Sequence, residues 1–147
     1  MTGRDDRPAI WRQILLGSAI LGLCALVHIL VLVGGIQALE AVDGLVTGPP
    51  APVERITMIT LSFGFVLLGH TFQVWIWAMT FYLNRSIKTL DDAVYFALVT
   101  TTTLGYGDIT LGRGRRIYGA MGAVSGLLTF GLSTAFLVSL MEAMLRT

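Results

Sequence analysis

The sequence predicts an all-α integral membrane protein. The chain has 147 residues with a mean hydropathy of +0.76, and 54% of them are hydrophobic while only 13% are charged. Three long runs, residues 14–38, 56–84 and 117–141, contain no Asp, Glu, Lys or Arg. Since about 20 apolar residues are enough to cross a bilayer as a helix, we expect three transmembrane helices.

The first run gives an N-terminal segment, residues 1–40, with one transmembrane helix. The run is longer than the apolar core of a signal peptide, so we expect it to be retained. It is not a voltage sensor, because only Arg12 stands at its edge and such a sensor needs several arginines within the span. A face on which a neighbouring helix could pack is offered by the small residues Gly17, Ser18, Gly22 and Ala25. Residues 41–53, rich in Gly and Pro, are predicted to be an irregular linker.

The second run predicts a helix over about residues 56–84 and carries an unusual polar residue. His70 lies inside this span, as His28 lies inside the first, and ionisable side chains within a membrane are costly and often functional. Both are candidate pH sensors; the alternative is a neutral imidazole that is hydrogen-bonded to a neighbouring helix. Trp75, Trp77 and Tyr82 approach the end of the span and predict an interfacial aromatic belt.

A fourth uncharged stretch, residues 93–107, is too short to cross and is broken by glycine at its end. We expect a re-entrant helix over about residues 90–101, capped by Thr89, with Asp92 three residues on to close a capping box. Non-helical backbone at membrane depth is tolerated only where it is buried in protein or lines a watery path. The residues after this helix must meet that condition.

The segment Thr103-Leu104-Gly105-Tyr106-Gly107-Asp108 follows three further threonines, Thr100, Thr101 and Thr102. Glycine adopts at little cost the backbone conformations that side chains resist. The segment resembles the selectivity filter of potassium channels, in which successive backbone carbonyls replace the hydration shell of K⁺. Residues 54–147 as a whole look like the span, pore helix, filter and span of small bacterial potassium channels.

The resemblance implies roles for individual residues around the filter. K⁺ would be held by the backbone carbonyls of Thr103, Leu104, Gly105 and Tyr106 with the Thr103 hydroxyl, in a filter formed by residues 103–107. The expected supports of the filter are Thr102, Tyr95, Phe96 and Asp108. Tyr95 could donate a hydrogen bond to Asp108, and the Tyr106 ring is expected to pack outward against Tyr95 and Phe96.

The last span predicts the inner helix, over about residues 116–145. By the resemblance Gly126 is a gating hinge; the alternative is close helix packing, because Gly122 and Gly126 form a small-xxx-small pair. The cavity and inner mouth would be lined by Leu127, Phe130, Thr134, Val138 and Glu142. The plainer alternatives are lipid contact for the apolar side chains and an ion pair with Arg146 for Glu142.

One filter strand cannot surround an ion, and the sequence contains one such strand without an internal repeat. We therefore expect a fourfold homotetramer in the lipid bilayer, as a multi-pass protein of the cell (plasma or inner) membrane, with K⁺ as its permeant ligand and no cofactor. No stretch outside the spans is long enough for a soluble ligand-sensing domain, and the net charge of +1 implies no nucleic-acid partner. An enzyme is not expected, since Gly105-Tyr106-Gly107 lacks the third glycine of a dinucleotide fingerprint. The alternatives are a weakly selective cation channel and a non-conducting scaffold or modulatory subunit.

Two arguments about orientation disagree. A filter that faces outward, as in the family, would leave only Arg55 and Arg146 on the inner side. The outer side would then carry Arg4, Arg7, Arg12, Arg85, Lys88, Arg113, Arg115 and Arg116, against the positive-inside rule. We favour the outward filter, because the inner helix has a fixed relation to it, and keep an inverted channel as the alternative.

Overall fold

The computed structural model describes residues 10–43 and 51–146, and this part of the chain is helical without strands. The long helices are α1 (Ile10–Asp43), α2 (Pro52–Leu83) and α4 (Arg116–Arg146). Between α2 and α4 lie the short helix α3 (Leu90–Thr101) and the 3₁₀ turn η1 (Arg113–Arg115). Three helical segments are long and apolar enough to cross a membrane, namely Ile10–Ala41, Pro52–Leu83 and Arg113–Ala143. The predicted all-α membrane fold with three spans is confirmed.

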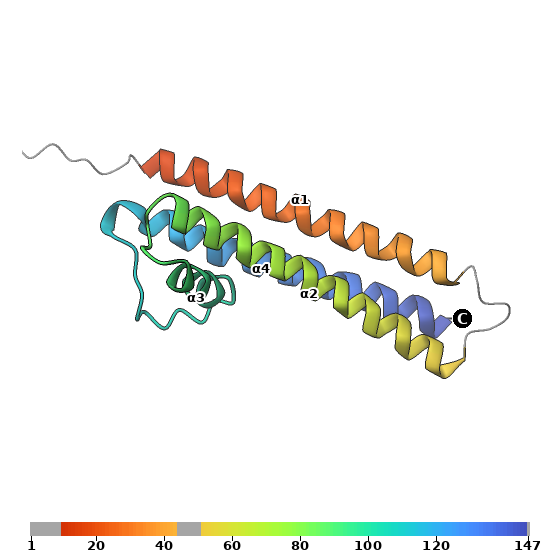
Figure 1. The fold of residues 1–147 in the computed structure, drawn as a ribbon. Coiled ribbons are helices and arrows are strands. Elements are labelled where there is room, and N and C mark those ends of the chain that lie inside the picture. Colours follow the sequence, from red (N-terminus) through yellow and green to blue (C-terminus); the bar gives the residue numbers. More distant parts are fainter. Residues whose placement is uncertain (1–9, 44–50, 147) are drawn as a thin grey trace, which may run out of the picture.

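The three long helices lie side by side, and α1 packs against both α2 and α4 (Figure 1). The short helix α3 lies at one end of this bundle, beside the end of α2 and the start of α4 (Figure 1). The first turn of α1 is at the same end, which we call the filter end. At the filter end α3 packs against α2 and α4.

The helices extend beyond the uncharged runs. α1 continues to Asp43 and α2 begins at Pro52, so helix occupies both ends of residues 41–53, and the linker prediction was wrong there; residues 44–50 lie outside the described residues. Proline fits the first helical turn because its missing N–H would be unpaired in any case. The Glu54 carboxylate also accepts a hydrogen bond from the backbone N–H of Ala51 at 2.8 Å. Charged residues at a helix end therefore stabilise helix beyond the hydrocarbon.

A tight reversal joins α2 to α3. Arg85 adopts a left-handed conformation (φ 52°), a position that glycine usually fills, and the backbone N–H of Ser86 bonds back to the Phe81 carbonyl at 2.9 Å. α3 then has the predicted bounds, and the Thr89 hydroxyl accepts from the N–H of Asp92 at 3.2 Å. The cap fixes where the re-entrant helix begins.

An aromatic core joins α2, α3 and α4. Trp77 and Phe81 are completely buried, and Phe81 contacts Phe96 of α3 and Tyr118 of α4 at ring-centroid distances of 5.0 and 5.7 Å. The belt prediction was therefore wrong for Trp77, whose ring faces the protein. Trp75 is exposed, as a belt residue would be. The orientation of α3 is fixed by these ring contacts.

The face through which α1 packs includes Gly17 of the predicted small residues, but not Ser18 or Gly22. Ser18 is exposed and a Cβ on Gly22 would meet nothing within 4 Å, so neither lies against a helix. Buried positions instead recur every three, four or seven residues, at Gln13, Gly17, Cys24, His28, Leu32, Gly35 and Leu39. Gly17 and Gly35 are the close contacts, since a Cβ there would lie 2.6 Å from Met121 and 2.8 Å from Phe65.

A chain of polar side chains, which we call the polar seam, connects the three long helices within the membrane. Nε2 of His28 on α1 and Nε2 of His70 on α2 both lie close to Oγ of Ser133 on α4, at 2.8 and 3.1 Å. Gln73 donates to the Ser125 hydroxyl at 3.0 Å and accepts from the Thr129 hydroxyl at 2.8 Å. The two histidines thus make hydrogen bonds to a neighbouring helix, as the alternative to a pH-sensing role predicts. Their role as pH sensors stays a prediction.

Gly126 is where α4 comes closest to α3. A Cβ at this position would lie 1.8 Å from the backbone oxygen of Thr101 and 2.7 Å from its carbonyl carbon. Backbone atoms cannot move aside as a flexible side chain can. The geometry therefore favours the packing role of Gly126, while the hinge role stays a prediction.

We predict that Gly126→Ala destabilises the protein by about 2 kcal/mol or more, because overpacking against backbone forces α3 and α4 apart. Thermal unfolding in detergent measures the loss. Gly64→Ala is the matched control, since its added methyl meets no atom within 4 Å on α2. Unchanged stability of Gly126→Ala with altered gating would contradict the packing role and support a hinge.

Candidate functional site

The candidate site is the non-helical segment that follows α3. Thr103, Gly105 and Gly107 have positive φ angles of 63°, 57° and 80°, while Leu104 and Tyr106 between them do not. The sign of φ thus alternates over the five residues. The sequence predicted this freedom at the two glycines. It gave no signal for Thr103, a β-branched residue for which φ > 0 is a true outlier.

The start of this segment is tied to the end of α3. The backbone N–H of Thr103 donates to the Thr100 carbonyl at 3.0 Å, and that of Gly105 donates to the Val99 carbonyl at 3.2 Å. The Thr102 hydroxyl also bonds back to the Leu98 carbonyl at 2.6 Å. These bonds position the filter segment at the C-terminal end of α3, whose helix dipole is negative and favours a cation.

The far end of the segment is held by a second contact. The Tyr95 hydroxyl donates to the Asp108 carboxylate at 2.5 Å, as the sequence predicted, and the N–H of Ile109 donates to the same carboxylate at 3.0 Å. The bond from Tyr95 lowers the pKa of Asp108, because it stabilises the ionised carboxylate. It raises the pKa of Tyr95 for the complementary reason. At neutral pH the pair is therefore a phenol donating to a carboxylate.

The Tyr106 side chain is largely uncovered within one chain. It is 68% exposed, and among the described residues no ring contact joins it to Tyr95 or Phe96. Phe96 packs on Phe81 instead. The outward packing of Tyr106 against pore-helix aromatics stays a prediction.

The predicted cavity residues share one property. All five are exposed in the single chain: Leu127, Phe130, Thr134, Val138 and Glu142. Phe130 also stacks on His70 with a centroid distance of 4.4 Å. The opposite face of α4 carries the polar seam, which the sequence analysis missed. The four-residue spacing of Ser125, Thr129 and Ser133 was the signal that could have found it.

The site offers oxygen atoms for a cation rather than a side-chain cluster. Among the described residues, no group of three His, Cys, Asp or Glu side chains could hold a metal ion. The backbone and hydroxyl oxygens of the filter segment are hard ligands that suit an alkali cation.

The comparison with protein families agrees with this geometry. A family described as ion channel matches residues 69–143, which is just over half of the chain and includes α3, the filter segment and most of α4. The chain belongs to the ion channel family. The channel is a multi-pass membrane protein.

Individual relatives match a shorter part of the channel. It is 40% identical over 53 residues to potassium voltage-gated channel subfamily A member 4 of Homo sapiens, covering 35% of this chain and 8% of that protein. Member 6 of the same subfamily from Mus musculus is 40% identical over 58 residues, or 39% of this chain and 11% of the relative. The matches thus span about a tenth of each relative's length. No solved structure matches the channel.

We predict that Tyr95→Phe loosens the filter segment of the channel, because the hydroxyl that anchors Asp108 is removed. Hydrogen exchange of peptides covering residues 103–112 should become several-fold faster at pH 7. Asp108 has a lowered pKa, so the anchor is complete above the usual aspartate value of about 4 and is lost as the pH falls below it. The difference between wild type and variant should therefore persist unchanged from pH 5 to pH 8.

Tyr82→Phe is the matched control, because Tyr82 is an exposed tyrosine on α2 away from Asp108. Its exchange over residues 103–112 should equal that of the wild type. Equal exchange in Tyr95→Phe and Tyr82→Phe would show that the bond does not restrain the segment.

Proposed function

We propose that the protein is a potassium-selective channel that conducts K⁺ passively through a tetrameric filter of backbone carbonyls. The observation that carries the proposal is the alternation of φ over residues 103–107. When residues of positive and negative φ alternate, successive carbonyls can point to the same side of the strand. A row of oxygens on one side is what a dehydrated K⁺ needs.

The exposure of the filter segment supports assembly of four copies. Residues 102–108 are all exposed in the single chain, with Leu104 at 59% and Tyr106 at 68%. Exposed non-helical backbone does not occur in contact with lipid, so other protein or water must cover it. Four strands around an axis provide both, and they give Tyr106 a neighbouring chain to pack against.

The inner face of α4 completes the proposed path. The five exposed residues predicted for the cavity share one side of α4, where they would line the cavity and the inner mouth. A ring of four Glu142 carboxylates would concentrate cations there. The weakly selective cation channel has the same architecture, and the intact Gly105-Tyr106-Gly107 favours potassium over it.

Reversal potentials of the purified protein in planar bilayers, with K⁺ on one side and Na⁺ on the other, test the proposal. We predict a strong preference for K⁺ in the wild type and its loss in Gly105→Ala, because alanine is strained at a φ of 57°. Gly112→Ala is the control, since Gly112 lies in the same loop with an ordinary φ of −56° and open space around it.

Each outcome separates the candidate functions. Current without ion preference in the wild type would indicate the weakly selective channel. Equal preference in Gly105→Ala and Gly112→Ala would remove the filter from the mechanism. The absence of current under all conditions would indicate a scaffold or modulatory subunit.

The polar seam supports a further proposal, that protons regulate conduction. His70 stacks on Phe130 of the proposed cavity face, and both histidines contact Ser133 of the same helix. His28 is the titratable group that faces His70 among the described residues, with 4.8 Å between ring centroids. A proton on this pair would put positive charge next to the cation path.

We predict that wild-type current falls as the pH drops from about 8 to 5, the range in which imidazoles commonly titrate, and that His70→Ala loses this dependence. Recordings at constant K⁺ gradient measure it. Reversal potentials should stay unchanged, because the filter is intact. Superimposable pH curves for the two proteins would refute the role of His70.

A further inference from the structure

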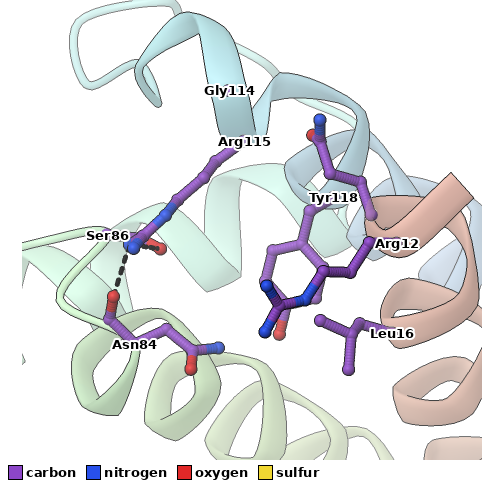
Figure 2. Close-up of a pocket in the computed structure, with 8 residues that line it drawn as sticks. Arg12, Leu16, Asn84, Ser86, Gly114, Arg115 and Tyr118 are labelled. Carbon is purple, nitrogen blue, oxygen red and sulfur yellow. Dashed lines mark hydrogen bonds between the residues drawn. The ribbon is translucent and has the colours of Figure 1, made fainter. Parts of the chain in front are cut away.

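A small cavity lies at the filter end, apart from the proposed ion path. Its volume is about 190 Å³, and it lies between the first turns of α1, the reversal after α2 and the start of α4. Arg12 enters it from α1 and Arg115 from η1, and Asn84 and Ser86 form part of its wall (Figure 2). Three separate elements of the chain thus build one pocket.

The pocket carries positive charge that the described residues do not neutralise. Arg115 is held in place, because one of its terminal nitrogens donates to the Asn84 carbonyl and to the Ser86 hydroxyl, the latter at 2.7 Å. A guanidinium has five N–H donors, so three of those on Arg115 remain for a ligand. Arg12 has no hydrogen bond or ion pair with another described residue, and none of the described residues that line the pocket is acidic. Two guanidinium groups suit an oxyanion such as phosphate, which accepts their hydrogen bonds in pairs.

The position of the pocket indicates where such an anion comes from. Arg12, Asn84 and Arg115 lie at the ends of the three helices that are long and apolar enough to span a membrane, and span ends are where lipid headgroups are expected. Below Arg12, α1 presents an apolar surface to the bilayer, with Leu15 70% and Leu16 50% exposed. Leu16 also lines the pocket, so a polar site and an apolar track are continuous.

We propose that this pocket binds the phosphate headgroup of an anionic phospholipid, with an acyl chain along α1. The headgroup accepts hydrogen bonds from Arg12 and Arg115 and so connects the start of α1 with the start of α4. Juxtamembrane arginines are attracted to anionic lipid. The site does not depend on potassium selectivity, because it lies outside the filter segment and its test measures binding alone.

Native mass spectrometry of the detergent-purified full chain tests the site. Titration with phosphatidylglycerol should show tighter binding than titration with phosphatidylcholine. Arg12→Gln should weaken phosphatidylglycerol binding roughly fivefold, the effect expected for one arginine at a membrane surface. Arg12 is exposed, so the substitution leaves the fold intact. Arg115→Gln should weaken binding at least as much, since it also releases the reversal at Asn84.

Arg113→Gln is the matched control, because Arg113 is an exposed arginine of the same 3₁₀ turn that does not line the pocket. Its phosphatidylglycerol binding should equal that of the wild type. Three results would overturn the proposal. These are equal affinity for the two lipids, an equal loss in Arg113→Gln and Arg12→Gln, and full displacement of the lipid by excess inorganic phosphate, which would indicate a site for the free anion.

Discussion

Backbone that leaves the helical conformation inside a membrane must find its hydrogen-bond partners within the protein, and the pore region is built around that requirement. The end of α3 supplies the carbonyls of Val99 and Thr100 to the first residues of the filter segment. α4 can approach this end only because Gly126 has no side chain to meet the Thr101 carbonyl. Tyr95 then holds the far end through Asp108. The carbonyls of Val99 and Thr100 thus satisfy backbone N–H groups that lipid could not.

The number of helices and most of their bounds could be predicted because charge and capping are local signals. The face through which each helix packs against its neighbours could not be predicted. Lipid is as apolar as a protein core, so a span that is hydrophobic all round does not reveal which side packs. The sequence predicts that Trp77 belongs to the interfacial aromatic belt, yet its side chain is fully buried in the aromatic core. Gly17 and Gly22 look alike in α1, yet only Gly17 meets a neighbouring helix.

In the candidate site, too, the features that depend on local sequence could be predicted, and those that depend on helix packing could not. The positive φ angles of Gly105 and Gly107 could be predicted because glycine favours them. Thr103 also has a positive φ, although threonine rarely adopts one. The bond between Tyr95 and Asp108 could be foreseen from the resemblance to potassium channels. The seam between His28, Gln73 and Ser133 joins three spans, and its partners depend on helix rotations that only the fold defines.

The conformation of Thr103 has a consequence for how the filter is maintained. A left-handed threonine costs free energy and persists only when its surroundings require it, yet in the single chain this residue is exposed. If four copies assemble as proposed, the neighbouring strands and the ions between them compensate this cost. In that assembly the permeant ion would be a structural ligand, and occupancy, assembly and filter shape would form one coupled equilibrium.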